Sequence, residues 1–214
     1  MTWSLRERLR QDGRQAHDRV DAAFADFDLT QPEGLGGFLE AHAIALDAMA
    51  LARTPRDEDR EIDPRRPSYD YEAHSNPAEL RRLVHSDLAA LSDARQRTSA
   101  CEPHTAKAGV RPNSLQECHP IASDYVLLGS RLGLQVLRRR WQASPYPSVL
   151  AAAAYISLPP VSRQWKALCH LLAAKPAEGC EADRVVADAI HIFYLFETAA
   201  TDVKSSISGE RIFV

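Results

Sequence analysis

The chain of 214 residues has little glycine, no long apolar run and no excess of positive charge. Its 9 glycines favour helices that are joined by short turns. The longest apolar candidate, residues 149–158, is much shorter than the roughly 20 residues that a helix needs to cross a bilayer. The net charge of -3 argues against nucleic acid as the principal partner. Composition therefore predicts neither a membrane nor a nucleic acid as a partner.

Paired cysteine motifs and an export signal are also lacking. None of the 4 cysteines forms a C-x-x-C pair. The first 14 residues are charged and contain no apolar run of the kind that a secretory signal requires. We therefore expect reduced thiols and a cytoplasmic location.

Apolar residues recur at helical spacing along most of the chain, and no segment has the alternation of a strand. We expect one all-α domain over residues 1–214, with irregular segments at about 54–76 and 95–119, where proline or polar residues accumulate. The helices are expected at about residues 3–27, 33–53, 77–94, 120–141, 148–155, 160–175 and 181–205.

A single histidine follows basic residues in the first predicted helix. At about 100° per residue, His17 lies on one stripe with Arg10, two turns earlier, and with Phe24, two turns later. A guanidinium at that position reaches a carboxylate on a ligand that lies over the imidazole. The residues alone leave two interpretations open, a histidine at the edge of the core and a histidine that binds iron.

Two glycines lie one turn apart in the helix predicted after Pro120. Gly129 and Gly133 share a face, and each costs roughly 1 kcal/mol relative to alanine in a helix interior. A flat strip of this kind indicates that either another helix or a planar ligand approaches the backbone. Ser130 adds a hydroxyl group that can hold a water molecule beside such a ligand.

The order of these motifs resembles the bacterial heme oxygenases that produce biliverdin, particularly those that accompany bacteriophytochromes. The resemblance spans most of the chain, and the order and spacing of its motifs are more specific than any one of them. It rests on LR-x6-H-x3-D-x2-F (residues 9–24), FDLTQPEGLGGFLEAHAIAL (27–46), YVLLGSRLG (125–133), LPPVSRQWKAL (158–168) and AIHIFYLFETA (189–199).

The resemblance implies a helical bundle in which heme lies between the first helix and a kinked distal helix. In that arrangement His17 ligates the iron, and Arg10 and Tyr125 hold the propionates. Gly129 and Gly133 let the distal helix cross close over the heme, and Ser130 anchors a water network near the oxygen site. The implied reaction opens heme to biliverdin, carbon monoxide and ferrous iron.

The resemblance also implies partners. The reaction consumes dioxygen, and a bacteriophytochrome is the implied receiver of biliverdin. No nucleotide-binding fingerprint is present, so the electrons come from an external reductase or ferredoxin.

Three residues depart from the family's pattern near the predicted site. Gly13 stands where the family often has threonine, and Leu134 stands where a second small residue usually follows the distal glycine. Leu128 stands where an acidic residue commonly precedes the first distal glycine in the phytochrome-linked members. These departures keep two alternatives open. One is a heme-binding or sensor protein on the same scaffold without turnover. The other is a helical adaptor in which His17 and the glycines only pack.

Overall fold

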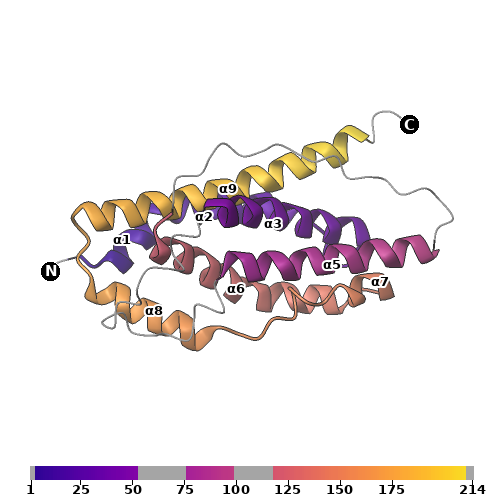
Figure 1. Cartoon of the computed structure of the whole chain (residues 1–214), viewed down its shortest axis with the longest axis horizontal. Coiled ribbons are helices and arrows are strands. Elements are labelled where there is room, and N and C mark those ends of the chain that lie inside the picture. Colours follow the sequence, from indigo (N-terminus) through magenta and orange to yellow (C-terminus); the bar gives the residue numbers. More distant parts are fainter. Residues whose placement is uncertain (1–2, 53–75, 99–117, 211–214) are drawn as a thin grey trace.

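The computed structural model describes residues 3–52, 76–98 and 118–210, and α-helices dominate these residues (Figure 1). The helices are α1 (Leu5–Asp12), α2 (Arg14–Ala25), α3 (Pro32–Ala52), α5 (Pro77–Thr98), α6 (Pro120–Gln142), α7 (Pro147–Ala151), α8 (Ser162–Ala174) and α9 (Cys180–Glu210). In the described residues, β-structure is limited to an isolated bridge between Ser4 and Pro176. The expected all-α fold class is thus confirmed. Among these helices none is long and apolar enough for a membrane span.

The prediction of one helix over residues 3–27 is wrong in one respect, because the helix is interrupted at Gly13. α1 starts with a capping box, in which Ser4 accepts a hydrogen bond from the Glu7 amide and the Glu7 carboxylate accepts one from Ser4. Gly13 then separates α1 from α2. A Cβ atom at this position would lie 2.7 Å from the carbonyl oxygen of Leu9. Glycine is therefore required at the break by a close backbone contact.

The other predicted helices are confirmed in position, with differences at their ends. α7 ends at Ala151, four residues before the predicted end. α9 continues to Glu210, because the apolar side chain of Ile207 extends its packed face beyond the predicted end. The two segments predicted to be irregular lie mostly outside the described residues, but residues 95–98 belong to α5.

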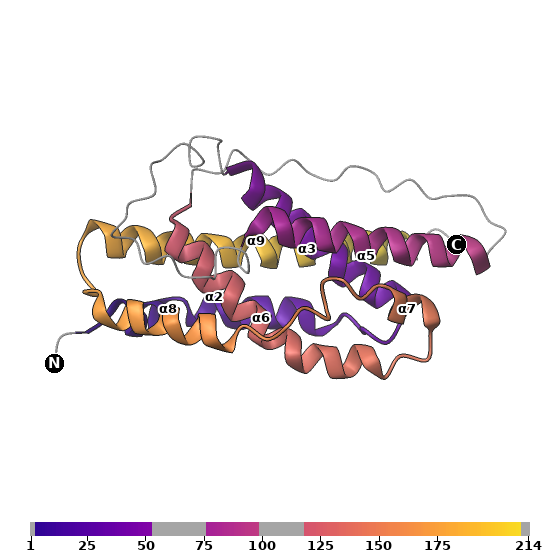
Figure 2. The ribbon, with the colours of Figure 1, turned by 60° about the horizontal axis from the view of Figure 1, so that its bottom comes forward.

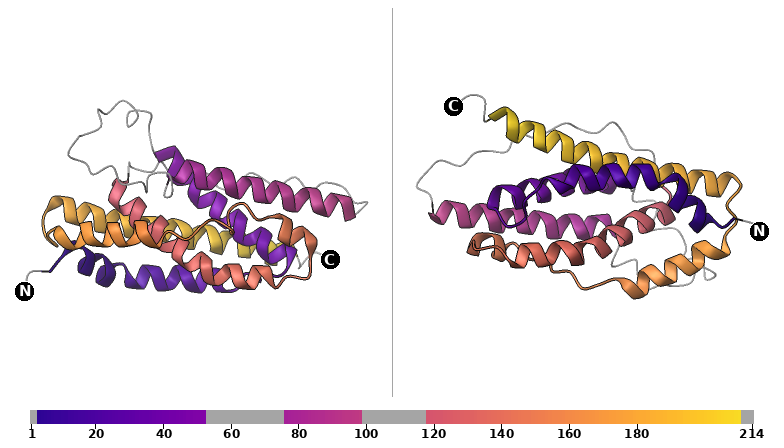
Figure 3. Two further views of the ribbon diagram at one scale, coloured as in Figure 1. Left: turned by 90° about the horizontal axis from the view of Figure 1, so that it is seen from below. Right: turned by 180° about the vertical axis from the view of Figure 1, so that it is seen from behind.

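One hydrophobic core receives side chains from every helix named above. α3 packs along both α5 and α9, and α9 spans the length of the bundle (Figures 1 and 3). α2 and α6 also pack against α9, and α6 runs obliquely across the bundle in Figure 2. In the described part of the chain, however, α2 and α6 have almost no contact with each other. α2 and α6 thus both pack on α9 but remain separated from each other.

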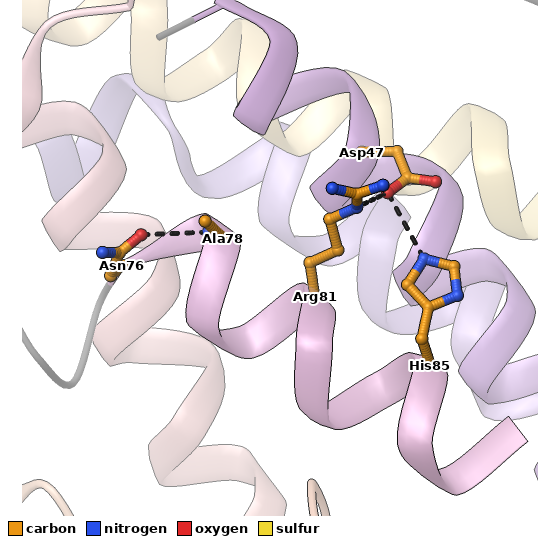
Figure 4. A network of polar contacts seen from close by, with 5 residues as sticks. All are labelled: Asp47, Asn76, Ala78, Arg81 and His85. Carbon is orange, nitrogen blue, oxygen red and sulfur yellow. Dashed lines mark hydrogen bonds and ion pairs between the residues drawn. The ribbon is translucent and has the colours of Figure 1, made fainter. Parts of the chain in front are cut away.

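The α3–α5 pair is also joined by polar side chains at its surface. Asp47 of α3 accepts hydrogen bonds from Arg81 and His85, which lie one turn apart on α5 (Figure 4). The His85 Nε2 atom lies 3.4 Å from the Asp47 carboxylate. The Asn76 side chain accepts the Ala78 amide at 3.0 Å and so starts α5 (Figure 4).

A buried carboxylate fixes the turn after α7. Asp87 of α5 accepts hydrogen bonds from the amides of Ala154 at 2.7 Å and Tyr155 at 2.8 Å. Burial raises the pKa of Asp87, and these two amides oppose that rise. The contact places the Tyr155 ring against His42 of α3, with 5.3 Å between ring centroids.

Candidate cofactor site between α2 and α6

Two adjoining cavities lie where α2 and α6 are held apart. The inner cavity has a volume of about 380 Å³ and the outer cavity about 820 Å³. His17, Tyr125 and Phe193 line both. The inner cavity is lined by His17, Val20, Asp21, Phe24, Phe38, His42, Tyr125, Val126, Gly129, Ser130, Leu132, Gly133, Leu134, Leu137, Trp165, Phe193 and Phe196. The outer cavity is lined by Trp3, Glu7, Leu9, Arg10, Gln11, Gly13, Arg14, His17, Asp18, Tyr125 and Phe193.

His17 lies at the junction of the two cavities with an accessible ring. Its side chain is 56% exposed, and its Nδ1 atom lies 3.3 Å from the carboxylate of Asp21, one turn later on α2. Phe193 of α9 meets the imidazole edge-on, with 5.6 Å between ring centroids. An Nδ1–H that donates to a carboxylate leaves the lone pair on Nε2, which is the arrangement found at metal-binding histidines.

The predicted carboxylate-binding residues gather at the outer cavity. Arg10 lines this cavity together with Arg14, Tyr125 and His17. Tyr125 is half-buried and packs against Trp165 of α8. Burial raises the pKa of the Tyr125 hydroxyl, while Arg6 and Arg10 lower it. Tyr125 therefore stays protonated at neutral pH and is able to donate a hydrogen bond to an anion.

The glycine strip lines the inner cavity, and the neighbour that it has from another helix within 4 Å is the Trp165 ring of α8, at Gly129. A Cβ atom on Gly133 would meet no described atom within 4 Å, and one on Gly129 would meet the Trp165 ring at 3.6 Å, an ordinary contact. Close helix packing therefore does not explain the strip. Ser130 also lines the cavity, but its hydroxyl donates to the Leu127 carbonyl at 2.9 Å. Its oxygen is left as an acceptor.

The inner cavity runs from an exposed mouth to a buried end. His17, Ser130 and Gly133 are exposed, whereas Phe38 and Phe196 are 2% and 5% exposed. Leu134 is 4% exposed, so it belongs to the core and to the cavity wall at once. The site therefore offers polar groups at the surface and an apolar interior.

The structure brings the sequence-predicted residues to one place. His17, Tyr125, Gly129, Ser130 and Gly133 line the inner cavity, and Arg10 lines the outer one.

Sequence reasoning gave no site role to Asp21, Trp165, Phe193 or His42, although all four line a cavity. The i, i+4 spacing of His17 and Asp21 was a usable signal for one of them.

The described residues contain no group of three or more His, Cys, Asp or Glu side chains that could hold a metal ion. A heme iron needs fewer protein ligands, because the macrocycle supplies the others and a single histidine suffices. The residues at the two cavities therefore fit a metal ion that is already coordinated by a macrocycle and needs one histidine from the protein.

No protein-family model, curated protein or solved structure matches this chain. The function is accordingly inferred from the motifs and from the two cavities.

Proposed function

We propose that this protein binds heme between α2 and α6 and opens it to biliverdin, carbon monoxide and ferrous iron, in a heme oxygenase-like bundle. The observation that carries the proposal is the convergence at one pair of cavities of His17, Arg10 and the Gly129–Gly133 strip. The strip is more than a hundred positions from Arg10 and His17 in the chain, and no packing need explains the glycines.

The residues present fit heme chemically at each of its parts. His17 offers Nε2 to the iron, and the Asp21 carboxylate orients the ring. The strip carries no side chains of its own, and its open part at Gly133 would let a flat macrocycle lie close to the backbone, with Trp165 at the border beside Gly129. Arg10 and Tyr125, at the outer cavity, would hold the propionates with charge-assisted hydrogen bonds. The apolar inner cavity would accept the rest of the ring.

When bound, heme supplies the redox chemistry and is itself the substrate; dioxygen and an external reductase or ferredoxin supply the oxygen and the electrons. The protein's part is binding, orientation and control of water. Arg10 and Tyr125 set the rotation of the ring and therefore which edge faces the interior. Ser130, whose hydroxyl hydrogen is held by Leu127, presents an oxygen that accepts a hydrogen bond from water at the mouth. The buried aromatic side chains exclude water from the inner end.

A heme-binding or sensor protein without turnover is a second candidate, and Leu134 favours it. This side chain lines the inner cavity next to Gly133, so it takes up space on the α6 side of the ring. A bacteriophytochrome remains the proposed receiver of biliverdin under the first candidate only.

The two candidates are separated by reducing the heme complex in air. We expect the Soret band to decay while biliverdin absorption appears, with ascorbate or a ferredoxin and its reductase as the electron source. Carbon monoxide trapped by reduced myoglobin gives an independent measure of ring opening. A Soret band that persists under both donors, with no bilin extracted, would leave the sensor as the better description.

A further inference from the structure

His42 is the one buried polar side chain that lines the inner cavity among the described residues. It is 7% exposed and lies on α3, beside Phe38 and Phe196, the buried side chains that line the same cavity. Aromatic rings surround it on four sides, at centroid distances of 4.8 Å for Phe24, 4.3 Å for Phe38, 5.3 Å for Tyr155 and 5.6 Å for Phe196. A polar group in such a cage is costly unless something pairs with it.

The hydrogen bonding of His42 determines which ring nitrogen is available. Its Nδ1 atom lies 2.8 Å from the Phe38 carbonyl oxygen, which can only accept, so Nδ1 carries the hydrogen. Burial lowers the pKa of His42 to about 4, and the ring is therefore neutral at physiological pH. Nε2 is then an acceptor. No donor among the described residues forms a hydrogen bond with Nε2. Nε2 is nevertheless not one of the inaccessible side-chain atoms without a partner, so solvent-sized molecules can reach it. This atom therefore keeps some accessible surface, on a residue that lines the inner cavity.

A hydrogen-bond acceptor in this position would distinguish the two tetrapyrroles of the proposed reaction, heme and biliverdin. In heme all four pyrrole nitrogens are bound to iron, and the remaining polar groups are the propionates, which Arg10 and Tyr125 would keep at the outer cavity. The edge that reaches His42 then carries no donor. Ring opening and iron loss create N–H groups, and each end of the linear product is a lactam with its own N–H. The product can satisfy Nε2, and the substrate cannot.

We propose that His42 Nε2 accepts a hydrogen bond from a terminal lactam N–H of a linear tetrapyrrole, and so holds the bilin at the inner end of the cavity. This assignment rests on the proposed function, since heme opened at its inner edge delivers both lactams to His42. It makes His42 a product-recognition residue that distinguishes biliverdin from heme.

The test is a pair of titrations on the ligand-free full chain, one with biliverdin and one with ferric heme, each followed by absorbance. His42→Leu and His42→Phe remove the acceptor with different side-chain volumes, and His42→Gln keeps an acceptor oxygen. We expect the dissociation constant for biliverdin to rise about tenfold in the first two variants, as for loss of a buried hydrogen bond. It should stay within about threefold of wild type in His42→Gln, and the constant for heme should change less than about twofold in all three.

Three results would overturn the assignment. The first is wild-type affinity for biliverdin in both His42→Leu and His42→Phe. The second is no biliverdin binding by the wild type. The third is an equal loss for heme and biliverdin, which would mean that the substitutions only damage the cavity. The proposed function fails separately, if ferric heme produces no saturable Soret change with the wild type. Because biliverdin contains no iron, its titration remains informative in that case.

Discussion

The α3–α5 pair and the α2–α6 pair differ in how closely their two helices pack in the same bundle. α3 and α5 pack along each other, and Asp47, Arg81 and His85 join them at the surface. α2 and α6 are both supported by α9, yet they barely touch within the described residues, and cavities lie between them. Side chains of α3 and α5 fill the interface between these two helices. α2 and α6 each pack on α9 instead, and the space between them remains unfilled.

The side chains facing each interface account for this difference. On α5, Leu80, Val84 and Leu91 are buried in the core at helical spacing, and Leu91 lies 3.5 Å from the Cβ position of Gly36 on α3. On α6, Gly129 and Gly133 line the inner cavity, and neither has a side chain that could fill it. Because empty apolar space loses dispersion contacts, a cavity of this size carries a stability cost that a ligand would offset. We infer from this comparison that the open interface between α2 and α6 is the candidate binding site.

The largest expected effect comes from filling the open interface. Gly133→Phe should abolish saturable heme binding, because the new side chain enters the inner cavity where no described atom lies within 4 Å of the Cβ position. Folding should be unaffected, since glycine is the poorer helix former. Val136→Phe is the matched control, because Val136 is 62% exposed on the same helix and lines neither cavity. Heme titration and circular dichroism together measure both outcomes, and unchanged heme affinity in Gly133→Phe would contradict the site.

A second effect concerns pH and the inner end of the cavity. The pKa of His42 is lowered by burial from 6.5 to about 4, so between these values the unfolded chain binds a proton that the folded chain excludes. The free energy of unfolding is therefore not reduced by His42 above about pH 6.5. It falls by roughly 1.4 kcal/mol per pH unit as the pH decreases from there toward 4.

The measurement compares the free energy of unfolding in urea at pH 7 and pH 5. Wild type should lose about 2 kcal/mol more than His42→Leu over this interval, because other titrating groups cancel in the difference. The same pH dependence in both proteins would mean that His42 is not buried as a neutral ring.

A third effect concerns the outer cavity. Arg10→Ala should weaken heme binding about tenfold or allow a second ring orientation, since a charge-assisted contact to a propionate is lost. Arg6→Ala is the control, because Arg6 is an exposed arginine one turn earlier that lines neither cavity. The isomer composition of the biliverdin formed reports orientation. Equal behaviour of the two variants would make Arg10 an ordinary surface residue.

The smallest effect is expected at the closed interface. Arg81→Ala removes the link to Asp47, and both side chains are more than a third exposed, so solvent screening should keep the loss of stability under about 1 kcal/mol. Arg82→Ala, which breaks a pair with Glu79 inside α5, is the comparison variant. Heme affinity should not change in either. A drop in heme affinity for Arg81→Ala alone would mean that the two interfaces are coupled.

Much of the helical arrangement follows from local pattern, because proline starts and apolar spacing mark α3, α5 and α6. The break at Gly13 was missed, since it depends on the contact of residue 13 with the Leu9 carbonyl and not on a breaker motif. His17, Gly129 and Gly133 could be selected from spacing and from the resemblance. The role of His42 could not, because it depends on α9 and on the turn that Asp87 holds, both distant in the chain.

The central claim, that the open α2–α6 interface is a heme site with His17 as the iron ligand, is tested most directly by titrating ferric heme into wild type and His17→Ala. We expect one saturable site in wild type with a histidine-ligated spectrum. In His17→Ala that spectrum should be lost and be restored by added imidazole, which fits the space left by the exposed ring. Circular dichroism of both proteins confirms equal folding. An unchanged histidine-ligated spectrum in His17→Ala, or no saturable binding by wild type, would contradict the account.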